Sequence, residues 1–425
     1  MTVVPLFCAK LIRGHHADEA GSHAAPRGWG QRFNHWFNSR FNRMLDRYED
    51  ALKLALLRPL ATVLGITGLF VVSLALYPLV GKAYFPRTDP AQFVINLKAP
   101  TGTRIENTDK MVEQVEQVVR EVVPAKELRI IVSNIGMGPG FSSIYTPNSG
   151  PHTAFVQVGL NEGHRVSSFQ YMDRARQRLR RELPEMSAYF QTGGLVDAIL
   201  NLGMPAPIDI QVSGMNLEEA HQTASQIARQ VRQLPGVSDV LVPQDIDYPA
   251  LKLNIDRIRA SELGLNEKEI VGNVITALTS DGMIAPSYWV DPKSGNDYML
   301  TVQYPENYVK NFAGLATVPL RAPGASKPTR LDTVSQLSQF NAPTEVDHYQ
   351  LKRIIDVYVA PASEDLSGVL AGVHKILDET KLPPNIRTMV RGSANAMEVS
   401  FRAFGFGLLL ATLLVYLILV AQFES

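Results

Sequence analysis

Residues 59–81 constrain this chain most, because they form a long apolar run without any charged side chain. The run reads PLATVLGITGLFVVSLALYPLVG, with Arg58 before it and Lys82 after it. A helix rises about 1.5 Å per residue, so roughly 20 apolar residues cross the hydrocarbon core of a bilayer. The alternative is a buried helix of a soluble protein, but such helices seldom run this long without a polar face. The run therefore predicts a transmembrane helix, which we place at residues 58–83.

A second uncharged run, residues 403–423, predicts another transmembrane helix, which we place at residues 402–423. The first nine residues, MTVVPLFCA, are also apolar, but they are too short to span a bilayer and their charges, Lys10 and Arg13, follow them. A secretory signal has the reverse order. We interpret residues 1–13 as the end of a further membrane helix, and the chain as an internal segment of a longer multi-pass protein.

Residues 14–57 connect these apolar segments and carry an excess of basic over acidic side chains. Short basic loops of this kind are retained in the cytoplasm. Aromatic and leucine residues, such as Trp36, Phe37 and Phe41, recur there at helical spacing between arginines. This pattern predicts an amphipathic helix along the inner membrane face, although a soluble helix packed on a partner domain has the same periodicity. The residues between the two membrane runs then lie outside the cytoplasm.

Composition and motifs exclude several function classes. The 425 residues carry 41 basic and 41 acidic side chains, so the chain has no electrostatic footprint for nucleic acid. Cys8 is the sole cysteine, which excludes a disulfide framework and a thiolate metal site. The adjacent Asp347 and His348 have no companion nucleophile motif. We therefore expect no enzymatic active site, no cofactor and no resident metal.

The region between the two runs predicts two β-α-β-β-α-β units, a pattern typical of the ferredoxin-like split βαβ fold. The first unit, residues 90–193, has strands expected at 92–97, 128–135, 153–160 and 188–191, with helices at 104–123 and 169–183. The second unit comprises residues 206–245 and 343–392. Residues 246–342 interrupt it and are interpreted as an inserted small domain. The expected fold class is membrane α-helices plus an α+β domain.

Four stretches of the sequence together resemble a known family of membrane transporters. They are TVVPLFCAKLI near the start, LRPLATVLGITGLFVVSLALYPLVGKAYFPRTD around the first membrane run, LPGVSDVLVPQDIDYPALKLNIDRIRASELGL at 234–265, and RGSANAMEVSFRAFGFGLLLATLLVYLILVAQFES at the end. In this order they resemble the C-terminal half of resistance-nodulation-division (RND) efflux transporters. The resemblance is greatest to the hydrophobic/amphiphile, acriflavin-resistance-like multidrug branch.

This resemblance implies an architecture and a set of partners. The two βαβ-based units would be periplasmic pore subdomains, and residues 246–342 would be the docking subdomain. Such transporters are homotrimers in the inner membrane of Gram-negative bacteria, with a periplasmic membrane-fusion adaptor and an outer-membrane channel as partners. They export small amphiphilic substrates by using a proton gradient. Neither full apolar run here contains Asp, Glu, Lys, Arg or His, so the proton relay is expected on helices outside this sequence.

The loop at residues 136–150, GMGPGFSSIYTPNSG, is the first candidate for substrate contact. By resemblance it matches the glycine-rich switch loop that separates two drug pockets in the family. The candidate substrate-binding residues in it are Met137, Phe141, Ile144 and Tyr145. The alternative interpretation is a flexible connector between two strands.

Phe155 and Phe190 complete the candidate site, because by resemblance they match apolar pocket positions of the family. Ordinary core packing is the alternative for both residues. Apolar aromatic pockets suit bulky amphiphiles, since burial of apolar surface is non-directional and tolerates many shapes.

Two other functions stay open at this point. The methionines Met137, Met204, Met215 and Met283 raise the heavy-metal branch of the same superfamily, in which thioethers would hold a soft ion such as Cu(I). Scattered methionines also fill gaps in ordinary cores. The third hypothesis is a non-transporting assembly module that only binds partner subunits.

Overall fold

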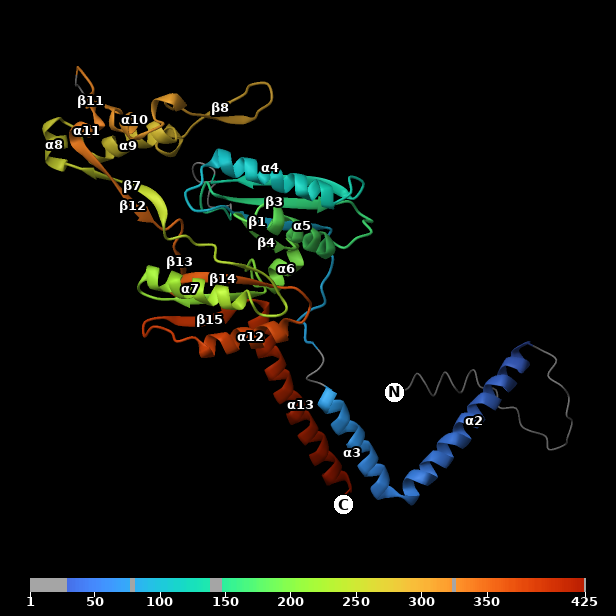
Figure 1. Ribbon diagram of the computed structural model, residues 1–425. Coiled ribbons are helices and arrows are strands. Elements are labelled where there is room, and N and C mark those ends of the chain that lie inside the picture. The colour runs from blue at the N-terminus through green and yellow to red at the C-terminus, as the bar shows by residue number, and fades with distance from the viewer. Residues whose placement is uncertain (1–28, 77–80, 138–146, 323–325, 424–425) are drawn as a thin grey trace, which may run out of the picture. The chain divides into compact units, whose positions relative to one another are not determined.

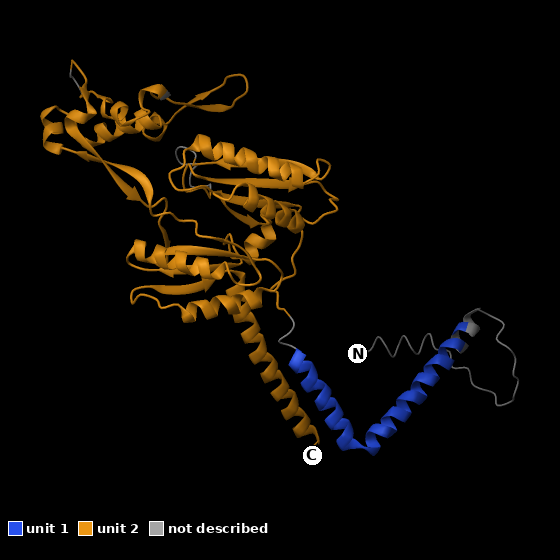
Figure 2. Cartoon of the chain, viewed as in Figure 1, with its two compact units in different colours: residues 1–80 blue, residues 81–425 orange. Residues whose placement is uncertain are grey.

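The computed structural model describes residues 29–76, 81–137, 147–322 and 326–423. The predicted helix end at 1–13 and three candidate residues, Phe141, Ile144 and Tyr145, lie outside these ranges. The chain divides into two compact units, residues 1–80 and 81–425, which Figure 2 distinguishes by colour.

The first unit consists, in its described part, of two helices, α2 (Trp29–Leu57) and α3 (Pro59–Leu76). Along α2 the exposed rings of Phe33, Phe37 and Phe41 follow one another at four-residue spacing, with centroids 6.4 and 6.0 Å apart. This stripe agrees with the predicted amphipathic pattern. Pro59 opens α3, a position at which its missing N–H costs no helical hydrogen bond.

Two helices among the described residues are long and apolar enough to cross a membrane, α3 and α13 (Ser393–Phe423). The sequence predicts a membrane-spanning segment at 402–423, and the helix that contains it, α13, begins earlier, at Ser393. An apolar run marks only where charged side chains end. Helical hydrogen bonding continues through the polar residues before it, such as Glu398 and Arg402.

The strands and helices of residues 92–191 form a four-stranded antiparallel sheet with two helices against one face, which we call the first subdomain (Figure 1). Its elements are β1 (Gln92–Lys98), α4 (Ile105–Val122), β2 (Leu128–Ile135), β3 (Thr153–Leu160), α5 (Ser168–Glu182) and β4 (Ser187–Gln191). The strand order is β2-β3-β1-β4. Alternate residues of β1, such as Phe93 and Ile95, are fully buried against α4 and α5, as a half-buried strand requires.

A second sheet and its helices come from residues 208–241 and 347–391, and we call them the second subdomain. Its strand order repeats along β6-β14-β5-β15. Its elements are β5 (Ile208–Ser213), α7 (Leu217–Val231), β6 (Val237–Leu241), β13 (Asp347–Tyr349), β14 (Lys352–Pro361), α12 (Leu366–Glu379) and β15 (Arg387–Arg391). Ile208, Ile210 and Val212 of β5 pack against α7 and α12. The alternate residues Asp209 and Gln211 are buried on the opposite face although they are polar.

The insertion between these two segments has a core of its own, which includes Leu265, Ile270, Leu320 and Leu331. Its elements are β7 (Tyr248–Ile255), α8 (Arg257–Glu262), α9 (Glu267–Leu278), β8 (Ser287–Val290), β9 (Asp297–Leu300), α10 (Phe312–Ala316), β10 (Pro319–Leu320), β11 (Thr329–Arg330), α11 (Leu331–Val334) and β12 (Ser335–Ala342). Strands β7 and β12 pair along their whole length, from Tyr248 with Ala342 to Ile255 with Ser335. This pairing brings the two ends of the insertion together. The chain therefore leaves the second subdomain and returns to it at neighbouring points. The predicted α+β class is therefore confirmed for the described residues.

Candidate functional site

A cavity of about 840 Å³ lies where the first and second subdomains meet. The first subdomain contributes α5 and β4 to its wall, and the second contributes β6, the end of β14 and the start of α12. The segment of residues 83–88 and the short helix α6 (Leu195–Leu200) complete the lining. This volume is within the range of roughly 300–1,000 Å³ that is typical of small-molecule sites.

The lining of the cavity is mainly apolar and rich in aromatic rings. Its large apolar side chains are Tyr84, Phe85, Phe169, Met172, Tyr189, Phe190, Leu195, Val196, Leu200, Met204 and Leu366. Phe190 belongs to the core of the first subdomain, whereas Leu195 and Val196 of α6 are exposed. The wall therefore combines fixed core residues with exposed apolar side chains that have little packing of their own.

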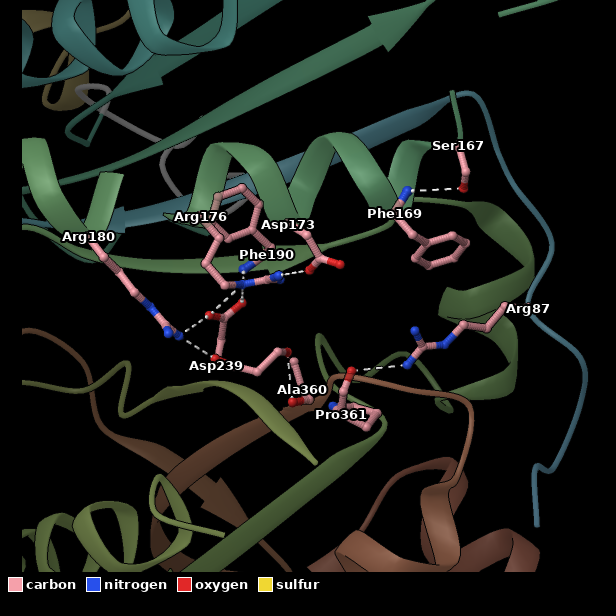
Figure 3. A network of polar contacts seen from close by, with 11 residues as sticks. Arg87, Ser167, Phe169, Asp173, Arg176, Arg180, Phe190, Asp239, Ala360 and Pro361 are labelled. Carbon is pink, nitrogen blue, oxygen red and sulfur yellow. Dashed lines mark hydrogen bonds and ion pairs between the residues drawn. The ribbon is translucent and has the colours of Figure 1, made fainter. Parts of the chain in front are cut away.

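A buried ion pair joins the two subdomains beside this cavity (Figure 3). Nε of Arg176, on α5, lies 2.9 Å from both carboxylate oxygens of Asp239, on β6. The two side chains are only 10% and 3% exposed. Arg176 also bonds Asp173 one turn earlier on α5 and lies over the ring of Phe190, 4.7 Å from its centroid.

Further donors converge on Asp239 from the first subdomain. The backbone N–H of Phe190 donates to it at 3.3 Å, and Arg180 donates at 3.4 Å. Arg180 also donates to the carbonyl oxygen of Ser238 at 2.6 Å. Burial raises the pKa of the Asp239 carboxyl, while the positive charge of Arg176 opposes that rise. The contact between the subdomains thus includes a buried carboxylate, Asp239, that accepts hydrogen bonds from several groups of the first subdomain.

Arg87 makes a second connection at the contact between the two subdomains, which we call the seam (Figure 3). Its guanidinium donates to the carbonyl oxygens of Pro361 and Ser363, at 3.0 and 2.5 Å. It also lies 5.2 Å from the ring centroid of Phe169 on α5, a cation–π distance. Arg87 therefore ties the 83–88 segment to the end of β14 and to the aromatic wall.

The predicted site residues that the structure describes lie in different places. Phe190 lines the cavity. Phe155 is half-buried on β3 and is absent from the described lining, and Met137 is exposed after β2. The cavity instead uses Phe169, which sequence reasoning did not single out because its position on α5 reads as an ordinary helix residue.

The four methionines that raised the heavy-metal branch also lie apart from one another. Met204 lines the cavity together with Met172, while Met137, Met215 and Met283 are exposed elsewhere. Within the described ranges, no group of three or more His, Cys, Asp or Glu side chains is arranged to hold a metal ion.

Comparison with known proteins assigns the family. The family model described as the AcrB/AcrD/AcrF family matches residues 1–425. The chain belongs to the AcrB/AcrD/AcrF family. The predicted relation to RND efflux permeases is therefore confirmed, whereas the branch within this superfamily is not decided by the match.

Solved structures similar to this member of the AcrB/AcrD/AcrF family include two crystal forms of a heavy metal efflux pump. Crystal form II has 20% sequence identity and a TM-score of 0.69, and the match covers 92% of this chain and 39% of that chain. Crystal form I has the same identity and TM-score, with 85% and 37% covered. At this identity the likeness shows a shared RND permease fold. The chain spans about two fifths of the length of these structures.

Proposed function

We propose that this chain is part of a proton-driven RND permease that exports small amphiphilic compounds, and that the cavity between the two subdomains holds them. The observation that carries the proposal is the aromatic and aliphatic wall of a cavity of about 840 Å³. Burial of apolar surface has no preferred direction, so such a wall accepts compounds of many shapes. Asp173 and Glu364 at the lining would face the polar end of a bound amphiphile.

Within this proposal the chain lies in the inner membrane of a Gram-negative bacterium as part of a multi-pass homotrimer. The two subdomains are ferredoxin-like pore subdomains in the periplasm, an interpretation supported by their repeated strand order. The insertion is the docking subdomain toward the adaptor and the outer-membrane channel. Helix α2 lies along the cytoplasmic membrane face, and no catalysis is involved.

The second candidate is export of a soft metal ion. Two observations favour it: Met172 and Met204 both line the cavity, and the similar solved structures are described as heavy metal efflux pumps. Thioether sulfur is a ligand that Cu(I) and Ag(I) prefer.

Replacing Phe169 with alanine tests the proposed pocket. We expect rhodamine 6G to bind the purified chain in lipid nanodiscs, and Phe169→Ala to weaken that binding about 5- to 10-fold. A 5- to 10-fold weakening corresponds to about 1–1.4 kcal/mol, which is roughly half of the free energy gained by fully burying a phenylalanine side chain. Fluorescence polarisation, with empty nanodiscs as the blank, gives the dissociation constant.

Phe155→Ala is the matched control, because Phe155 is a half-buried ring of the same subdomain that does not line the cavity. It should leave the dissociation constant unchanged. Equal weakening by both variants, or no dye binding above the blank, would contradict the pocket. Calorimetric titration with Ag(I) addresses the second candidate, since tight binding that is lost in Met172→Leu would favour metal export.

A further inference from the structure

A row of carboxyl and amide side chains lies on the face of the second subdomain's sheet that is opposite its hydrophobic core. Asp209 and Gln211 come from β5, and Asp356 comes from the neighbouring β14, directly across from Gln211. Nε2 of Gln211 donates to Asp209 at 3.0 Å and to Asp356 at 3.1 Å. One amide group thus bridges two carboxyls, and these contacts fix the orientation of the amide.

Gln244 continues the row on the other side of Asp356. Its Nε2 donates at 2.7 Å both to Asp356 and to Asp347, and its Oε1 accepts from the backbone N–H of Asp356 at 3.1 Å. Three carboxyls are therefore joined by two amides. No salt bridge links Asp209 or Asp356 to a basic side chain in the described part of the chain.

The central groups are withdrawn from water. Asp209 is 0% exposed and Gln211 is 4% exposed, and Asp356 is also buried. A buried ionised carboxylate is costly unless it is paired, and two of them bridged by one neutral amide repel each other. This arrangement favours a state in which the pair carries fewer than two negative charges.

Two buried oxygen atoms in this row have no hydrogen-bond partner among the described residues. They are Oδ1 of Asp209 and Oε1 of Gln211, and both are acceptors. The site therefore lacks a donor, although nearly all buried polar atoms in folded proteins are hydrogen-bonded. A proton on Oδ1 of Asp209 would turn one of these acceptors into a donor.

The electrostatic surroundings agree with this geometry. Burial, followed by the charge of Asp356, raises the pKa of Asp209 to about 8, and burial also raises the pKa of Asp356. The positive charge of Arg391, on β15, opposes these shifts. Its guanidinium lies 3.9 Å from the ring centroid of Tyr349. The other ionisable groups around the pair are Asp347, Glu345, Tyr358 of β14 and Tyr189 of β4.

We propose that Asp209 and Asp356 form a proton-binding site that holds one proton at neutral pH. The site lies at the contact between the subdomains, because Tyr358, directly across from Asp209, packs its ring against Tyr189 of the first subdomain at 6.4 Å. Loss of the proton places a second charge under this packing and weakens it. The proton site is expected whichever compound is exported.

With such a site, the stability of the folded chain should fall as the pH rises. Asp209 binds its proton more tightly in the folded chain than in the unfolded chain, where its pKa is near the ordinary value of 3.8. The stabilisation is therefore complete below about pH 4 and is lost as the pH rises toward about 8. The folding equilibrium constant should fall by up to about tenfold per pH unit in this window.

Urea unfolding of the whole 425-residue chain in detergent micelles, measured between about pH 5 and pH 9, tests this dependence. Burial also raises the pKa of Glu345, to about 7, so the test uses a Glu345→Gln background. Adding Asp209→Asn should remove most of the fall in the folding constant, because the amide mimics the protonated acid. Asp378→Asn, at an exposed position of α12, should retain it. An unchanged pH dependence in Asp209→Asn would overturn the proposal.

Infrared spectroscopy gives a second measurement, and its pH titration requires no stable Asp209 variant. The Glu345→Gln chain should show the carbonyl stretch of a protonated carboxyl group at neutral pH, and raising the pH above the pKa of Asp209 should abolish it. Asp209→Asn should diminish the same signal, because it removes one of the two carboxyl groups that share the proton. A missing signal at neutral pH, or an undiminished one in Asp209→Asn, would refute the shared proton.

Discussion

Replacing Asp239 with alanine is expected to destabilise the folded chain by about 3–5 kcal/mol, the usual cost of removing one partner from a buried ion pair. The variant leaves the guanidinium of Arg176 buried without its carboxylate, and it also removes the acceptor of the Phe190 N–H. Both losses fall on the seam between the two subdomains. Urea unfolding of the chain in detergent micelles measures the change in the free energy of unfolding.

A double variant separates the ion pair from simple loss of packing. Arg176→Met with Asp239→Leu removes both charges and keeps apolar volume at the seam, so it should recover most of the stability lost in Asp239→Ala. The matched control is Glu121→Gln, which breaks the exposed pair between Glu121 and Arg178 on α4 and α5. Exposed pairs contribute little, so this control should change stability only slightly. A cost of Asp239→Ala no larger than that of Glu121→Gln would show that the buried pair does not hold the seam.

The strands and helices could largely be predicted from the sequence, because the patterns that indicate them are local. Alternating apolar residues in β1 and β3 and helical spacing in α4 appear where they were expected, often to the residue, as for β3 at Thr153–Leu160. The predicted membrane segment at 402–423 covers only part of α13, because the last charged side chain before the apolar run is Arg402, whereas the helix begins at Ser393. Strand β14 is long, from Lys352 to Pro361, and it pairs with β13 at one end and with β6 at the other.

The seam was not accessible in the same way, since its contacts join residues far apart in the sequence. Arg176 and Asp239 are separated by 63 positions and come from an ordinary-looking helix and strand. The bridge from Gln244 to Asp356 spans 112 positions. No local periodicity pairs such residues. A charged residue at an alternate position of a largely apolar strand, such as Asp209 in β5, was an available signal, because a buried charge requires a partner or a proton.

The junction between β15 and α13 should be as sensitive to substitution as the seam. Gly392 has a φ of 92°, and a Cβ added there would lie 2.5 Å from the backbone oxygen of Pro207. That same oxygen accepts a hydrogen bond from the N–H of Ala394, in the first turn of α13, at 3.1 Å. Moving either backbone to relieve the clash would break this bond and loosen the start of α13 from the second subdomain.

Gly392→Ala should therefore cost clearly more than the about 1–2 kcal/mol that a left-handed conformation alone imposes on alanine. Gly163→Ala is the matched control, because Gly163 has a similar φ of 84° with no heavy atom within 4 Å of the added Cβ. Urea unfolding of both variants in detergent micelles separates the contribution of backbone conformation from that of the clash. Equal costs would mean that Pro207 moves aside freely. A larger cost for Gly392→Ala means that a rigid backbone contact joins the apolar helix to the sheet that carries Asp209.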